Sequence, residues 1–105
     1  MSRVQELNDA FRSTFEGGRV LITAGVSALP PVLVAQVLQK VRTYADFTPD
    51  SDPYGEHDFG SFELARHKFF WKIEYYDKSM TYGSEDPADP EQTARVLTVM
   101  LAEEY

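Results

Sequence analysis

One stretch of the sequence, TPDSDPYGEHDFG (Thr48 to Gly60), concentrates the side chains that are most suited to chemistry. The nine positions 50–58 contain no Lys or Arg but five acidic or imidazole side chains, namely Asp50, Asp52, Glu56, His57 and Asp58. Carboxylates ligate Ca²⁺ or Mg²⁺, and an imidazole with carboxylates ligates transition metals. The same groups also act as general acids and bases. Three interpretations therefore compete, namely a metal site, a catalytic site and a turn.

The spacing does not complete a metal-binding motif. An EF-hand loop that starts at Asp50 would have Asp52 in third place and Gly55 in sixth, as required. It would then have Tyr54 in fifth place and Ser61 in twelfth, where oxygen ligands are needed. We therefore predict no metal and no cofactor. We interpret Asp50 and Asp52 as turn residues that accept hydrogen bonds from backbone N–H groups two or three positions later.

A catalytic interpretation stays open as the alternative. It is a small metal-assisted or acid–base enzyme centred on Glu56, His57 and Asp58. No catalytic signature is completed, because the Asp-Phe-Gly tripeptide occurs without the other kinase motifs. In a strand, moreover, His57 and Asp58 would point to opposite faces. We therefore predict no catalytic residues.

The elements that position this stretch follow from the apolar periodicity. Val4, Leu7, Phe11 and Phe15 form one stripe of a helix, which Gly17-Gly18 is expected to end. The β-branched run 19–26 predicts a strand covered on both faces. A second helix is expected after Pro30-Pro31, which suit a first turn. Its apolar stripe consists of Leu33, Val37, Val41 and Tyr44.

A β-hairpin is predicted from FGSFEL and KFFWKIEYYD, which are joined by residues 65–67. In the second strand the uncharged side chains Phe69, Trp71, Ile73 and Tyr75 share one face, which we expect to face the core. The opposite face carries Phe70, Lys72, Glu74 and Tyr76. A further short strand is expected at residues 80–82.

A last helix is predicted near the C-terminus of the sequence. Asp89 is a suitable N-cap, Pro90 follows it, and Gln92 completes a capping pattern. The apolar face of this helix would consist of Val96, Leu97, Met100 and Leu101, and Glu103 and Glu104 would oppose its dipole. The predicted order is α-β-α-β-β-(β)-α. It indicates one α+β domain over 1–105, with two layers, an antiparallel sheet of three or four strands and about three helices.

The composition restricts the function class. The chain has 17 acidic and 10 basic residues, a formal net charge of −7. That charge disfavours direct binding to nucleic acid or to an anionic membrane, because both need clustered Lys and Arg. The absence of Cys excludes disulfides and thiolate chemistry. The polar first residues do not form a signal peptide, so we expect a cytoplasmic protein.

The remaining features favour a protein-interaction module. Residues 43–65 contain six acidic residues and no basic one, which suits a partner with a basic surface. Aromatic residues flanked by charges resemble the centre of an interface. The predicted contact residues are Asp50, Asp52, Glu56, Asp58, Phe70 and Tyr76. A homodimer that uses the aromatic strand face is a further alternative.

Four stretches together resemble a bacterial family catalogued as a domain of unknown function. They are GGRVLITAGVSALP, DFTPDSDPYGEHDFGSFEL, FFWKIEYYD and YGSEDPADPEQTARVLTVMLAEEY. The resemblance runs from about Leu7 to Tyr105 and supplies no catalytic residues. It implies an association with plasmids and other mobile elements, some of whose small acidic proteins inhibit host defence. It therefore suggests an accessory or anti-defence protein of the anti-restriction or anti-CRISPR kind.

Overall fold

The strand with the strictest alternation, β3 (His67–Tyr76), organises the fold. The structure, a computed structural model, describes residues 2–105. Phe69, Trp71 and Ile73 are buried against the helices, as the alternation predicts. β2 (Phe59–Leu64) pairs antiparallel with β3 through the two-residue turn Ala65-Arg66. Both turn residues have positive φ, at 52° and 69°, which is the geometry of a type I′ hairpin.

The segment predicted as the last helix contains a strand instead, so that prediction was wrong. β4 (Ala94–Leu101) lies between β3, to which it is antiparallel, and β1 (Gly18–Ile22), to which it is parallel. Its residues are buried on both faces, so its sequence is a nearly continuous apolar run without strand alternation. A buried helix has the same kind of sequence, so periodicity alone does not distinguish the two. The supposed cap is a turn, in which the Asp89 carboxylate accepts a hydrogen bond from the Glu91 N–H at 2.9 Å.

The first strand is shorter and more exposed than predicted. β1 ends at Ile22, and residues Ala24–Ser27 form the short helix α2. β1 is an edge strand, and most of its residues are exposed, so the expectation that both faces are covered was wrong. The short strand expected at residues 80–82 is also not found in residues 2–105, where an isolated bridge joins Tyr76 to Gly83.

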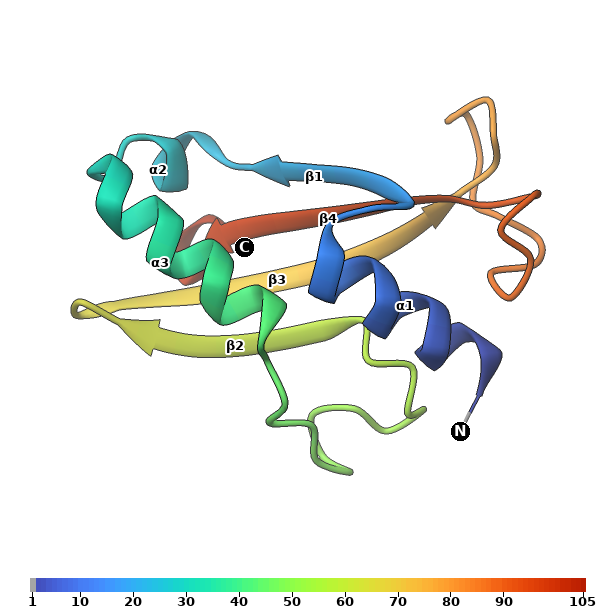
Figure 1. Cartoon of the computed structure of the whole chain (residues 1–105), viewed down its shortest axis with the longest axis horizontal. Coiled ribbons are helices and arrows are strands. Elements are labelled where there is room, and N and C mark those ends of the chain that lie inside the picture. The colour runs from blue at the N-terminus through green and yellow to red at the C-terminus, as the bar shows by residue number, and fades with distance from the viewer. Residues whose placement is uncertain (1) are drawn as a thin grey trace.

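The longer helices cover one face of the sheet, as Figure 1 shows. α1 (Arg3–Thr14) and α3 (Pro31–Arg42) bury Phe11, Val37 and Val41 against the core strands. α1 ends at Phe15, which has a φ of 61°, rather than at the glycines. The result is a two-layer α+β fold with a mostly antiparallel four-stranded sheet, which confirms the predicted class. Within residues 2–105 no helix has the length and apolarity needed to span a bilayer.

Glu103 and Glu104 belong to a short 3₁₀ helix, η1 (Ala102–Glu104), and not to the end of an α-helix. The Glu104 carboxylate accepts hydrogen bonds from the Thr23 hydroxyl at 2.6 Å, the Leu101 N–H at 2.8 Å and the Gly25 N–H at 3.0 Å. The Thr23 hydroxyl, followed by the Leu101 N–H, holds the pKa of Glu104 below its usual value. Glu104 thereby fastens η1 to the start of α2.

Candidate functional site

Two acidic loops lie at the same end of the sheet. Residues 46–58 lead into β2, and residues 77–91 form most of the connection from β3 to β4. Because β3 is antiparallel to both neighbours, both loops attach to the strands on this side of the sheet: β4 starts opposite Tyr76, the last residue of β3, and β2 starts opposite Lys72, four residues earlier (Figure 1). These two loops, which we name the acidic end, hold ten of the 17 acidic residues and one of the ten basic residues, Lys78. The ten are Asp46, Asp50, Asp52, Glu56, Asp58, Asp77, Glu85, Asp86, Asp89 and Glu91.

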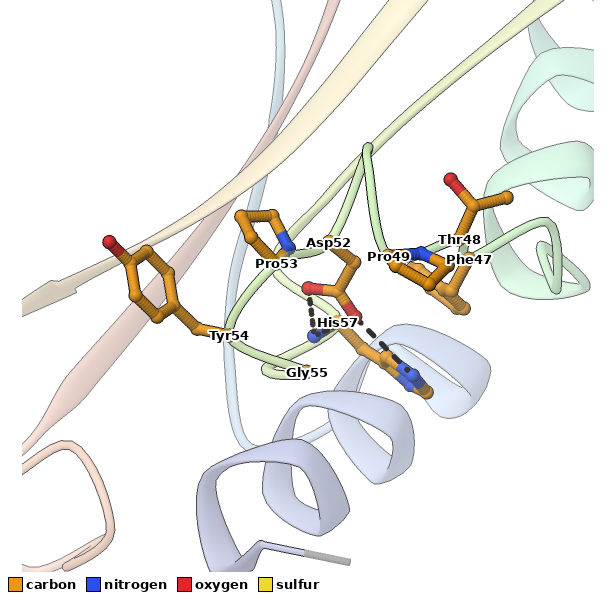
Figure 2. A pocket seen from close by; sticks show the side chains of 8 residues that line it. All are labelled: Phe47, Thr48, Pro49, Asp52, Pro53, Tyr54, Gly55 and His57. Atoms are coloured by element: carbon orange, nitrogen blue, oxygen red, sulfur yellow. Dashed lines mark hydrogen bonds and ion pairs between the residues drawn. The ribbon is translucent and has the colours of Figure 1, made fainter.

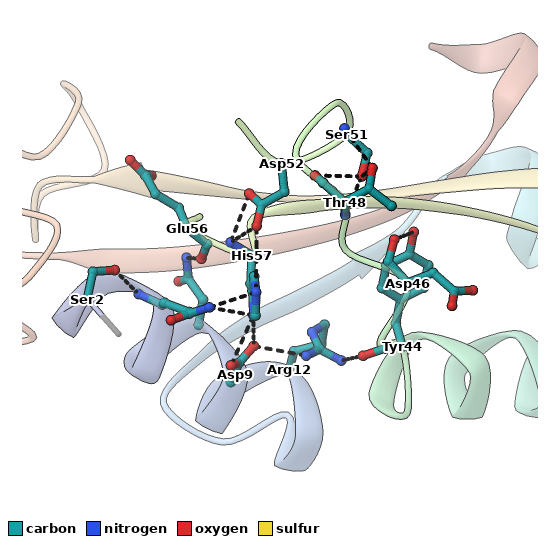
Figure 3. Close-up of polar contacts among 12 residues, drawn as sticks. Ser2, Asp9, Arg12, Tyr44, Asp46, Thr48, Ser51, Asp52, Glu56 and His57 are labelled. Atoms are coloured by element: carbon teal, nitrogen blue, oxygen red, sulfur yellow. Dashed lines mark hydrogen bonds and ion pairs between the residues drawn. The ribbon is translucent and has the colours of Figure 1, made fainter. Parts of the chain in front are cut away.

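His57 fixes the first acidic loop to α1. Its Nδ1 lies 2.8 Å from Asp9 Oδ1, and its Nε2 lies 2.7 Å from Gln5 Nε2. The tautomer with the hydrogen on Nδ1 satisfies both contacts, since it donates to Asp9 and accepts from the Gln5 amide. The ring also stacks on Phe47, with 3.8 Å between centroids and 3° between planes. Figure 3 shows the imidazole directed at α1 rather than at solvent.

Arg12 extends this contact to the end of α3. Its Nη2 lies 3.0 Å from Asp9 Oδ1, and its Nη1 donates to the Val41 and Tyr44 carbonyls, both at 3.0 Å. These carbonyls belong to the C-terminal end of α3 and to the residues just after it, where backbone acceptors lack helical partners. Asp9 is therefore shared between His57 and Arg12, and α1 positions both α3 and the loop that follows it.

The Asp52 carboxylate acts as a turn former, at longer range than predicted. It accepts a hydrogen bond from the His57 backbone N–H at 3.2 Å, five residues on, and its side chain is 8% exposed. Its Oδ2 also lies 3.6 Å from His57 Nε2. Asp50, by contrast, is exposed to solvent. The loop walls a shallow depression of about 470 Å³, in which Figure 2 shows Asp52 directed at His57 and Tyr54 directed away.

The other two loop carboxylates meet at Tyr75 on β3. The Tyr75 hydroxyl lies 3.3 Å from Glu56 Oε2 and 3.5 Å from Asp58 Oδ2. Burial raises the pKa of Tyr75 far above its usual value, so the hydroxyl remains a hydrogen-bond donor at neutral pH. Burial, and then the charge of Glu56, raises the pKa of Asp58. Glu56 and Asp58 therefore bring two carboxylates close together beside the Tyr75 hydroxyl on β3.

Asn8 and Arg95 hold the two acidic loops together beneath the surface. Asn8 is 0% exposed, and its amide donates to the Tyr75 hydroxyl at 2.8 Å and to the Glu56 carbonyl at 3.0 Å. Its Oδ1 accepts from Arg95 Nε at 2.8 Å. Arg95 also donates to the Pro87 carbonyl in the second loop, and burial lowers the pKa of its guanidinium. One buried network thus ties both loops to α1 and β4.

The structure divides the residues of the alternative catalytic centre. The His57 ring contacts Asp9 and Asp52, whereas the Glu56 and Asp58 carboxylates reach Tyr75. The Nε2 atom that a general base would present to a substrate is occupied by the Gln5 amide. Over residues 2–105 no group of three or more His, Asp or Glu side chains is arranged to hold a metal ion. The contacts of His57 are those of a structural link.

The two aromatic candidates lie apart on the face of the sheet that the helices leave open. Tyr76 is the last residue of β3 and borders the acidic end. Phe70 lies six residues earlier, about 20 Å along the strand. It packs against Tyr105, with 5.3 Å between ring centroids, and against Phe59 at the same centroid separation. The structure therefore places Tyr76 beside the second acidic loop, whereas Phe70 packs on Phe59, the residue that follows the first.

Sequence reasoning missed Asn8, Asp9, Arg95 and the whole second acidic loop. One signal for Asn8 was available, because it falls in the apolar stripe of the first helix, four residues after Val4 and three before Phe11. A polar residue in such a position must find buried partners. Arg95 gave no comparable signal, since its segment was interpreted as a helix in which it would be exposed.

We expect Asp58→Asn to change how stability depends on pH. The folded-state pKa of Asp58 lies above its ordinary value of 3.8, so the folded protein binds this proton more tightly. Stability is therefore lost as the pH rises from 3.8 through the raised pKa, and the variant avoids this loss. Urea titrations should show the unfolding free energy of the variant gaining on that of the wild type as the pH rises above 3.8. The exposed Asp50→Asn variant is the control. Parallel curves of unfolding free energy against pH for Asp58→Asn and the wild type would contradict the prediction.

Comparisons with known proteins identify no ligand and no reaction for this site. Residues 22–104 match a family described as "Protein of unknown function (DUF3768)". The match includes both acidic loops, the strands β2, β3 and β4, and only the last residue of β1. No curated protein and no solved structure matches the chain.

Proposed function

The chain belongs to this family of unknown function, and we propose that it is a protein-interaction module whose acidic end binds a basic surface of another protein. The observation that carries the proposal is the uneven distribution of charge. Outside residues 46–58 and 77–91 the chain has seven acidic and nine basic residues. The negative charge of the protein therefore resides at one end, and such a field steers and orients an oppositely charged partner.

The rigidity of the acidic end supports binding. The Tyr75 hydroxyl lies within hydrogen-bond distance of both Glu56 and Asp58 and donates to one of them at a time. Both loops are fastened to the buried Asn8–Arg95 pair. A surface whose loops are already ordered loses less conformational entropy when it binds. We therefore propose Asp50, Glu56, Asp58 and Tyr76 as contact residues. Asp52 is committed to His57, and it serves the site by shaping the loop.

The nature of the partner follows from the charge and from the resemblance to proteins of mobile elements. Proteins that bind DNA or RNA present clustered Lys and Arg, and these are the basic surfaces that an acidic end fits. We propose a host defence protein with such a surface as the first partner to test. In this proposal the chain inhibits by occupying a basic groove and does not itself contact nucleic acid.

Charge reversal tests the proposal. Protein immobilised through a tag should capture a basic protein from a bacterial lysate at low salt, and lose it as salt rises. The variant Asp50→Lys, Glu85→Lys, Asp86→Lys, Glu91→Lys reverses four exposed charges of the acidic end. We expect affinity for the captured protein, measured by interferometry, to fall about tenfold or more, at roughly 0.3–1 kcal/mol for each charge.

The matched control reverses exposed acidic residues elsewhere. Glu6→Lys, Glu16→Lys, Glu63→Lys and Glu103→Lys change the net charge by the same amount but lie outside the acidic end. We expect this variant to retain affinity within about threefold. Equal loss of binding in both variants would show a dependence on net charge alone, and unchanged binding in the first variant would overturn the proposal.

A further inference from the structure

The two edges of the sheet differ in how they are protected. At the β2 edge the Ser61 N–H donates to the Tyr44 hydroxyl at 3.4 Å, so a side chain occupies an outward backbone group. At the β1 edge, within residues 2–105, the strand pairs with β4 alone, and Figure 1 shows no strand on its other side. β1 is free of proline and carries a single charge, Arg19. Of the devices that usually prevent an edge strand from pairing, it has only this charge and its short length of five residues.

The backbone of β1 presents a free set of hydrogen-bonding groups. The Thr23 N–H donates to the Val99 carbonyl on β4, so Thr23 faces inward. Because successive residues of a strand alternate, the N–H and C=O groups of Ile22, Val20 and Gly18 are directed away from β4. Beside them Leu21 is 50% exposed and Ile22 is 37% exposed, one on each face of the sheet. The edge thus offers both backbone pairing and apolar surface.

We propose that the β1 edge binds the β1 edge of a second copy of this chain, antiparallel, to give one continuous eight-stranded sheet. A two-fold axis at Val20 places Val20 opposite its own copy and Gly18 opposite Ile22 of the partner. All outward backbone groups are then paired, with about six hydrogen bonds. In this register Arg19 faces Leu21 of the partner, so like charges do not oppose each other.

The charge distribution favours a second copy in this orientation. β1 begins beside Arg95 at the acidic end and runs away from it. An antiparallel partner therefore places its acidic end at the opposite side of the joint sheet. The two negative regions lie about as far apart as the fold permits, beyond the range of effective repulsion at physiological salt. Both acidic ends stay open, so the dimer would present two copies of the site proposed above without depending on its function.

The first test is the mass in solution. Sedimentation equilibrium of the wild type should give twice 11.9 kDa, with dissociation on dilution. Leu21→Lys adds a charge to the free edge while leaving the core intact, and it should weaken the dimer at least about tenfold. Tyr82→Lys, an equal change at a side chain that is 74% exposed in the second acidic loop, should leave the mass unchanged. A wild type that stays monomeric at roughly millimolar concentration would overturn the proposal.

The second test examines the register, and it uses the absence of Cys from the chain. Arg19→Cys and Leu21→Cys proteins, mixed under mild oxidation, should form a disulfide-linked heterodimer faster than either forms with itself. The reason is that a non-hydrogen-bonded pair places the two Cα atoms about 4.5 Å apart, within disulfide range. Both side chains are exposed, so neither variant should disturb folding. A dimer that does not favour this mixed cross-link would contradict the β1 pairing, as would a dimer unaffected by Leu21→Lys.

Discussion

Asn8→Ala is expected to destabilise the protein by about 3–5 kcal/mol, because it strands a buried guanidinium. The Asn8 Oδ1 atom is the acceptor for Arg95 Nε, and both residues are at most 4% exposed. The Asn8 amide also serves the Tyr75 hydroxyl and the Glu56 carbonyl. Alanine leaves three polar groups without this partner, and such groups cost about 1–3 kcal/mol each, more when charged. The loss is a large part of the roughly 5–15 kcal/mol that holds a domain of this kind folded.

Urea unfolding followed by circular dichroism measures this effect as a lower midpoint at an unchanged slope. Ser13→Ala is the matched control, since Ser13 is an exposed residue of the same helix. It should shift the unfolding free energy by less than about 0.5 kcal/mol. If the unfolding free energy of Asn8→Ala lies within 1 kcal/mol of the wild-type value, water or a rearranged side chain replaces the amide.

The double variant Asn8→Ala, Arg95→Met identifies the cause of the loss. If the stranded cation dominates, removing it should recover part of the stability, so the double variant should lose less than the sum of the two single variants. Purely additive losses would mean that Asn8 and Arg95 act independently. The same variants bear on function, because the network fastens both acidic loops. Hydrogen exchange in residues 46–58 and 77–91 should therefore accelerate in Asn8→Ala.

The local elements of this fold were predictable because their signals are short in range. The alternation of β3 and the stripe of α3 depend on neighbours along the chain, and both were predicted correctly. β4 was not, because an apolar run buried on both faces fits a helix and a strand equally well by periodicity. The β-branched residues Val96, Thr98 and Val99 favoured the strand, but the capping pattern at Asp89 outweighed them.

The geometry of the candidate site depends on contacts between residues far apart in the sequence. Asp9 and His57 are separated by 48 positions, and Asn8 and Arg95 by 87. The sequence placed Glu56, His57 and Asp58 side by side, and only the packing of α1 against the loop separates their side chains onto different partners. The predicted hairpin already attaches residues 77–91 on the same side of the sheet as the first loop. The buried link between the loops needed β4 as a strand, because Arg95 reaches Asn8 and the Pro87 carbonyl from it.

Gly60→Ala is expected to disturb the core, at a cost of about 3 kcal/mol. Gly60 lies opposite Trp71 in the β2–β3 register, and the indole occupies the space that a side chain at position 60 would need. A Cβ at position 60 would come within 2.3 Å of Trp71 Nε1 and 2.8 Å of Tyr44 Cε1. Trp71 is 0% exposed, and the ring would have to move within a close-packed interior. Glycine in a strand interior here permits the close approach of another side chain.

Gly83→Ala is the matched control, because its nearest neighbour to a new Cβ is the Tyr75 carbonyl at 3.8 Å, an ordinary contact. It should change the unfolding free energy by less than about 0.5 kcal/mol. Trp71 is the single tryptophan, so its fluorescence reports directly on the displaced ring and should shift to longer wavelength in Gly60→Ala. Adding Trp71→Phe provides a smaller ring, and the combined loss should be less than the sum of the separate losses. The contact of Gly60 with Trp71 and Tyr44 also positions the start of the first acidic loop. Equal unfolding free energies of Gly60→Ala and Gly83→Ala would therefore contradict the packing that positions the site.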